Sequence, residues 1–102
     1  MAMFMCILEK NMKYSWDENK RRINRKKHGL DFADAPLVFA GLTLTFEDDS
    51  PDYNEKRFKT LGMLGLFVVV IVHTETEDEI RVISMRKADS RERKIYEEAV
   101  CI

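Results

Sequence analysis

The most constraining feature of the sequence is an unbroken apolar run over residues 66–72, Leu-Phe-Val-Val-Val-Ile-Val. A run that is apolar at both odd and even positions is typical of a strand covered on both faces. It is also too short to cross a bilayer as a helix. We therefore expect a sheet with this strand at its centre, and we expect no contact with a membrane.

Length and composition indicate one small globular domain. The chain has 102 residues, of which 45% are hydrophobic, and no Gly/Pro/Ser-rich linker divides it. Cys6 and Cys101 lie near opposite ends without metal-ligand spacing, which argues against a disulfide scaffold and favours the reducing cytoplasm. The apolar start lacks the features of a signal peptide. We interpret residues 1–12 as an N-terminal extension or an edge strand, and residues 13–102 as the domain.

Helix signals lie toward the two ends of this domain. A first helix is predicted over residues 18–28, with Asp17 as its N-cap and Gly29 as its C-terminal stop. A second, shorter helix is predicted over residues 32–39. A third begins near Asp89 or Ser90, where Asp89-x-x-Glu92 resembles a capping box.

Strand signals fill the middle of the chain. They cover residues 42–47, 56–64, 66–74 and 80–85, and a further short strand can precede Trp16. Short connections between successive strands favour antiparallel pairing. The predicted fold class is therefore α+β: an antiparallel sheet of four strands, or five with the extra one, two N-terminal helices and one C-terminal helix.

Charge is segregated along the chain although the formal net charge is only −1. Residues 20–27 hold six Lys/Arg and no acid, whereas residues 31–55 hold seven acids and no Lys/Arg. Lys20, Arg25, Lys26 and Lys27 have no acid at the i, i+4 spacing that stabilises helix surfaces. Such cations favour a phosphate-bearing partner bound in a salt-dependent way, and a merely solubilising surface remains the alternative.

Three arginines on or beside predicted strands are candidate phosphate ligands. Arg57, Arg81 and Arg86 carry the planar fork that suits bidentate phosphate contacts. The alternative is an ion pair with Asp48, Asp49 or Glu55. Because Arg81 and Arg86 are five residues apart, an ideal strand would direct them to opposite faces.

The two histidines are read differently. His28 ends the basic helix, where the helix dipole favours its charged form, and acid–base work is the equal alternative. His73, at the end of the apolar strand, is expected to be a packed or hydrogen-bonded histidine.

Several familiar catalytic motifs are absent from the sequence, including a Gly-rich phosphate loop, GxSxG, HExxH and Cys-x-x-Cys. We therefore expect no metal and no cofactor. Arg, Lys, His, Tyr and Glu side chains suit RNA cleavage by transfer to the neighbouring 2′-OH, which needs proton transfer and charge stabilisation on phosphorus. A binding module without cleavage is one alternative. A structural domain whose acidic segment, residues 47–55, pairs with the strand arginines is another.

An ordered set of residues across most of the chain resembles the BrnT toxin family. The set comprises Trp16-Asp17, Lys20, Asn24, Lys27-His28-Gly29, Phe32, Ala35, Asp48/Asp49, Glu55-x-Arg57, Gly62, Arg81-x-Ile83-Ser84-x-Arg86-x-Ala88 and Glu92-Arg93-x-x-Tyr96. Met85 departs from the pattern, since many relatives carry a small residue there. The resemblance implies a RelE-like fold and an RNA-cleaving toxin that blocks translation. It also implies an antitoxin partner with a DNA-binding domain, whose complex with the toxin represses their promoter, so that DNA is contacted only through the antitoxin.

The resemblance also suggests roles for single residues. Arg57, Arg81 and Arg86 would hold the scissile phosphate. His28 or Glu55 would be the general base, and Tyr96 or Lys27 would supply a proton. The remaining candidates, Lys20, Arg25 and Lys26, would bind the RNA backbone together with Lys27.

Overall fold

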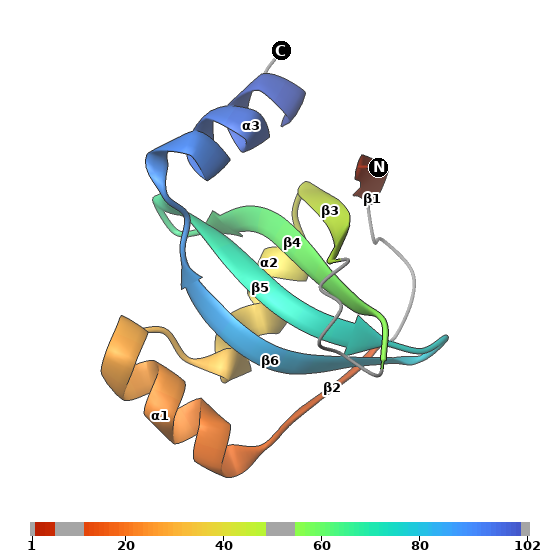
Figure 1. Ribbon diagram of the computed structural model, residues 1–102, viewed down its shortest axis with the longest axis vertical. Helices are drawn as coiled ribbons and strands as arrows, with labels where there is room; N and C mark the ends of the chain where they lie inside the picture. The colour runs from red at the N-terminus through yellow and green to blue at the C-terminus, as the bar shows by residue number, and fades with distance from the viewer. Residues whose placement is uncertain (1, 6–11, 49–54, 101–102) are drawn as a thin grey trace.

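The computed structural model describes residues 2–5, 12–48 and 55–100 and confirms the α+β fold class (Figure 1). Cys6, Asp49 and Cys101 lie outside these residues. In chain order the elements are β1 (Ala2–Met5), β2 (Lys13–Trp16), α1 (Glu18–His28), a 3-10 turn η1 (Phe32–Asp34), α2 (Ala35–Phe39), β3 (Thr43–Asp48), β4 (Arg57–Leu64), β5 (Phe67–Glu75), β6 (Glu79–Lys87) and α3 (Ser90–Val100).

The strands form one sheet in the order β1-β3-β4-β5-β6-β2. The four expected strands, β3 to β6, pair antiparallel as predicted, and the additional strand before Trp16 is present as β2. β2 runs parallel to β6, and β1 adds a strand beside β3. A parallel neighbour was not expected, because short connections predict only antiparallel pairs and β2 is remote from β6 in sequence.

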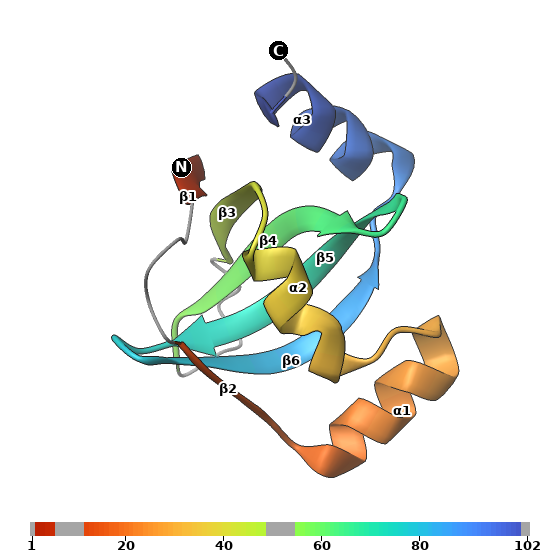
Figure 2. The same cartoon turned by 180° about the vertical axis from the view of Figure 1, so that it is seen from behind.

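Helices cover the two faces of the sheet unequally. α2 lies across one face, which we call the α2 face (Figure 2), and α3 stands over one end of the other, the α3 face (Figure 1). Alternate residues of β5 enter different cores: Val69 and Ile71 join the α2 face, whereas Val68 and Val70 join the α3 face. The prediction of a strand covered on both sides is confirmed for this part of the run. Leu66, which is 92% exposed, instead lies in the turn before β5.

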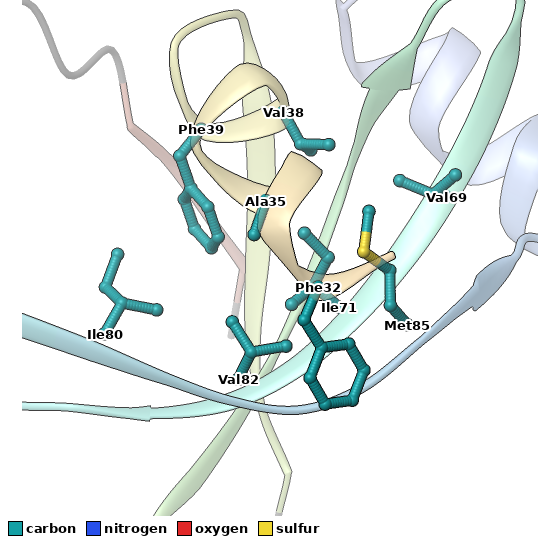
Figure 3. Close-up of a cluster of buried hydrophobic side chains, with 9 residues drawn as sticks. All are labelled: Phe32, Ala35, Val38, Phe39, Val69, Ile71, Ile80, Val82 and Met85. Atoms are coloured by element: carbon teal, nitrogen blue, oxygen red, sulfur yellow. The ribbon is translucent and has the colours of Figure 1, made fainter. Parts of the chain in front are cut away.

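The larger core lies between α2 and the sheet (Figure 3). Its buried members are Phe32, Ala35, Val38, Phe39, Val69, Ile71, Ile80, Val82 and Met85. The 3-10 turn η1 and helix α2 are short and supply four of these nine residues. Strands β5 and β6 supply the other five. Half-buried Trp16 extends it, with its ring 6.5 Å from that of Phe32 in an edge-to-face arrangement.

Helix α1 begins and ends where its caps predict. The Asp17 carboxylate accepts hydrogen bonds from the backbone N–H groups of Asn19 and Lys20, and Gly29 takes the left-handed conformation with φ 72°. The helix docks through a polar side chain, since its buried residue is Asn24. Asn24 Nδ2 donates to the Met85 carbonyl at 2.7 Å, and the Met85 N–H donates to Asn24 Oδ1 at 3.2 Å. β2 pairs with β6 only as far as Val82, so the Asn24 amide takes the place of a neighbouring strand at Met85.

Gly62 on β4 marks the closest approach of α2 to the sheet. A Cβ atom at this position would lie 2.6 Å from Val38 Cγ1 and 3.3 Å from Thr43 Cγ2. We expect Gly62→Ala to lower the free energy of unfolding by about 1–3 kcal/mol, because overpacking forces Val38 off its place in the core. Urea denaturation would measure this loss. Gly41→Ala is the control, because its Cβ would meet only the Val38 carbonyl at 3.8 Å and stability should change little; equal losses in both variants would contradict the packing argument.

His73 is a packed histidine, as expected, within a buried polar chain. Its Nε2 is hydrogen bonded to Thr60 Oγ1 at 2.7 Å, and Thr60 Oγ1 is hydrogen bonded to Thr45 Oγ1 at 2.8 Å. The ring lies between Phe39 and Phe58, with centroids 5.2 and 5.9 Å away. Burial lowers the pKa of His73 to about 4, so the folded protein holds this side chain neutral.

This lowered pKa predicts acid sensitivity. Below pH 6.5 the unfolded chain binds a proton at His73 that the folded chain does not, so stability is lost as the pH falls from 6.5 toward 4. At about 1.4 kcal/mol per pKa unit, the full loss is about 3 kcal/mol. Urea denaturation at pH 7 and pH 4.5 would measure it, with His73→Gln as the non-titrating comparison. An identical pH dependence in the variant would show that His73 is not the responsible group.

Candidate functional site

A β-bulge in β6 decides where the strand arginines lie. Val72 pairs with Ser84 but His73 pairs with Val82, which leaves Ile83 as an extra residue in β6. The extra residue reverses the alternation of side chains beyond it. Arg81 pairs with Thr74 and Arg86 pairs with Val70, and these two β5 positions share the α3 face. The prediction from ideal alternation is therefore wrong, and Arg81 and Arg86 lie on one face.

Cross-strand pairing arranges that face in rows. The row farthest from α3, which we call the outer row, holds Asp48, Arg57, Thr74 and Arg81 on β3 to β6. Asp48 pairs with Arg57, Thr74 pairs with Arg81, and Arg57 stands level with Thr74 because Phe58 pairs with His73. Arg81 is exposed and Arg57 is half-buried. Two of the predicted phosphate ligands thus share one row, two strands apart, which is about 10 Å between their Cα atoms.

The next row toward α3, the middle row, adds a cation that the sequence analysis missed. It holds Phe46, Lys59, Val72 and Ser84 on β3 to β6. Lys59 stands two residues after Arg57 on the same strand and therefore on the same face. That spacing was the available signal, but it becomes informative only when the structure shows which part of β4 α3 leaves uncovered. Together the two rows place Arg57, Lys59 and Arg81 on the part of the α3 face that α3 does not cover.

The third row is covered by α3 and holds Leu44, Leu61, Val70 and Arg86. Arg86 Nη1 and Nη2 donate to the two carboxylate oxygens of Glu92 at 2.8 and 2.9 Å. Glu92 was not among the ion-pair partners that the sequence analysis considered for the strand arginines, which were Asp48, Asp49 and Glu55. Hydrogen bonds from Arg86 hold the pKa of Glu92 below its ordinary value. Arg86 thus lies on the same face as Arg81 but fastens the start of α3 to the sheet.

Tyr96 is part of the same anchoring. Its side chain is buried, and its hydroxyl donates to the Leu42 carbonyl at 2.9 Å. Burial raises the pKa of the phenol, which keeps it protonated. The structure therefore places the Tyr96 side chain on the side of α3 that packs on the sheet, apart from the outer row. Glu55, in contrast, is exposed in the bend before β4, two residues from Arg57.

The basic helix contributes a second group of side chains beside β6. A hollow of about 220 Å³ separates α1 from the bulge and is lined by Lys20, Ile23, Asn24, Lys27, His28, Ile83 and Ser84. Ser84 also belongs to the middle row, so the hollow adjoins the cationic rows. His28 and the two lysines are thereby brought to the edge of the α3 face.

The other predicted cations of α1 lie elsewhere on the helix. Arg25 Nη1 is 4.0 Å from Asp31, a neighbour that helical spacing did not reveal. Asp31 chiefly binds Arg21, whose hydrogen bonds lower the pKa of that carboxyl to about 2. Lys26 is exposed and does not line the hollow. Of the four cations predicted to bind RNA, the structure brings Lys20 and Lys27 to the site.

The described residues form neither a metal site nor a helical membrane span. In residues 2–5, 12–48 and 55–100, no three His, Cys, Asp or Glu side chains gather closely enough to hold a metal ion. Within those same ranges, no helix has the length and apolar character needed to span a bilayer.

Comparison with known proteins identifies the family. No curated protein gave a match. Residues 16–92 match the model of the ribonuclease toxin BrnT of type II toxin–antitoxin systems. That range includes the basic helix, the bulge, both cationic rows and the Arg86–Glu92 pair. The chain belongs to the BrnT family of ribonuclease toxins.

Proposed function

We propose that this chain is an endoribonuclease that needs no metal ion and that binds RNA on the part of the α3 face that α3 does not cover. The observation that carries the proposal is the bulge at Ile83, which places Arg81 on the same face as Arg57 and Lys59. Converging cations in a preorganised site stabilise the charge that develops on phosphorus during phosphodiester cleavage. In this way protein side chains supply the positive charge that a metal ion supplies in other nucleases.

The proposed chemistry is attack of a 2′-OH on the adjacent phosphorus, with departure of the 5′ oxygen. Arg57 and Arg81 hold the phosphate from two strands, and arginine suits this because its fork donates two parallel hydrogen bonds. His28 is the general base that we favour over Glu55, since it lines the hollow beside Ser84. Lys27 is favoured over Tyr96 as proton donor, because the Tyr96 hydroxyl is buried and bonded to Leu42.

The remaining proposals concern the cellular setting. A type II toxin family implies an antitoxin. We propose that the antitoxin covers the outer and middle rows of the α3 face and carries the DNA-binding domain of the pair. The complex would then repress its own promoter, with the toxin contacting DNA only through its partner. Free toxin would cleave RNA in the cytoplasm and block translation.

The test is incubation of the purified chain with labelled RNA in the presence of EDTA. Cleavage that yields 2′,3′-cyclic phosphate ends is the expected result, because 2′-OH attack produces them. Salt-dependent RNA binding without cleavage, on naked RNA and on translating ribosomes, would instead identify a binding module. Cleavage that EDTA abolishes and Mg²⁺ restores would overturn metal independence.

A further inference from the structure

A separate hollow lies on the α3 face between the sheet and α3. Its volume is about 250 Å³, and its apolar walls are Phe46 on β3, Leu61 on β4 and Ile95 on α3. Asp48, Lys59 and Glu92 lie around them. Ile95 is 39% exposed, so an apolar side chain of α3 is left at the mouth of the hollow. This hollow is distinct from the one between α1 and β6.

The hollow borders the proposed phosphate site. Phe46 pairs with Lys59 in the middle row, and Asp48, the next residue on the same face of β3, pairs with Arg57 in the outer row. The step from one row to the next is about 7 Å along a strand, which is the scale of a single nucleotide. A nucleotide with its phosphate at Arg57 therefore has its base within reach of Phe46.

Two carboxylates at the hollow, those of Glu92 and Glu47, are already engaged. Both Glu92 oxygens accept from Arg86, and Glu92 Oε1 also accepts from the Asp89 N–H. Glu47, which also borders the hollow, lies 3.7 Å from Lys56. Carboxylates held in this way are poorly placed to read the edge of a base. Recognition in this hollow therefore depends on the aromatic and aliphatic walls, which accept any base because every base has a π-face.

We infer that the hollow between β3, β4 and α3 is a nucleobase subsite, in which a base next to the scissile phosphate stacks on Phe46 between Leu61 and Ile95. This inference rests on the proposed function, because the phosphate site fixes the position of the nucleotide. The Lys59 ammonium lies beside the same subsite and contacts the sugar-phosphate of that nucleotide. The subsite explains why α3 leaves an apolar residue exposed at this point.

The test compares ligands that differ only by the base. The four nucleoside 5′-monophosphates and ribose 5-phosphate are titrated into the full chain, with binding followed by amide chemical shifts in NMR. We expect each nucleotide to bind about tenfold more tightly than ribose 5-phosphate, because base–aromatic stacking contributes that much. Phe46→Ala should abolish the difference, and Phe46→Tyr should preserve it.

Two further measurements keep the inference separate from folding and from the proposed function. Phe46 packs on the smaller core, so Ile95→Glu serves as a second variant that blocks the mouth from an exposed position. It should also remove the preference for nucleotides over ribose 5-phosphate. Equal binding of the nucleotides and ribose 5-phosphate to the wild-type chain would overturn the subsite, whatever the cleavage assay shows. The proposed function falls separately, if the wild-type chain does not cleave RNA.

Discussion

Arg81→Ala should lower the rate of RNA cleavage by about a hundredfold, the usual effect of removing one donor that stabilises developing charge. Arg81 is exposed in the outer row and opposite Thr74, so its removal opens no cavity in the core. The free energy of unfolding should therefore change by less than about 0.5 kcal/mol. Single-turnover cleavage of labelled RNA, with stability checked by urea denaturation, measures both quantities.

Arg22→Ala is the matched control for this experiment. Arg22 is also exposed, and its replacement removes the same positive charge. It stands on α1 two residues before Asn24, which faces the sheet, and its side chain is therefore on the opposite side of the helix. Its replacement should leave the cleavage rate within a fewfold of wild type. Equal rates for Arg81→Ala and wild type would remove Arg81 from the phosphate site while leaving the family membership intact.

Asn24→Ala should lower the free energy of unfolding by about 3 kcal/mol. The amide bonds both backbone groups of Met85, and its removal leaves a buried N–H and a buried carbonyl without their partner. The same change should weaken RNA binding, because Lys20, Lys27 and His28 depend on this contact for their place beside β6. Urea denaturation and RNA titration at fixed salt would measure the two effects.

Asn19→Ala provides the comparison on the same helix. Asn19 is exposed, and its side chain accepts only a 3.2 Å hydrogen bond from Arg22. Its replacement should cost at most about 0.5 kcal/mol. A similar loss in both variants would indicate that helix propensity, and not the contact with Met85, controls the stability of α1.

Local signals in the sequence were sufficient to place the helices. Asp17 and Gly29 limit α1 because a cap acts on the nearest turn and needs no distant partner. The capping box at the start of α3 is confirmed in the same way: the Asp89 N–H donates to Glu92 Oε1 at 2.9 Å, and the Glu92 N–H donates to Asp89 Oδ1 at 2.8 Å. Strands β3 to β6 were also predicted to within one or two residues at each end.

Features that depend on register between strands were not predictable. The bulge at Ile83 exists only in relation to β5, so alternation within β6 alone placed Arg81 and Arg86 on opposite faces. Glu92 was assigned to a capping box, and nothing in the local pattern showed that the same carboxylate binds Arg86. Asn24 was named as one of the residues that resemble the BrnT family, but its contact was not predictable, because the Met85 backbone it bonds is 61 residues away.

Contacts that hold β2 and α1 in place join them to β6, more than 60 residues later in the sequence. Ser15 Oγ donates to the Glu79 carboxylate, and Asn24 Nδ2 donates to the Met85 carbonyl. During synthesis the N-terminal segment emerges first, so the cations of α1 leave the ribosome well before β6 exists to position them. A chain made only as far as β5 therefore lacks Arg81 in the outer row and lacks the Met85 backbone that Asn24 bonds, so the proposed RNA site cannot assemble before β6 has been made.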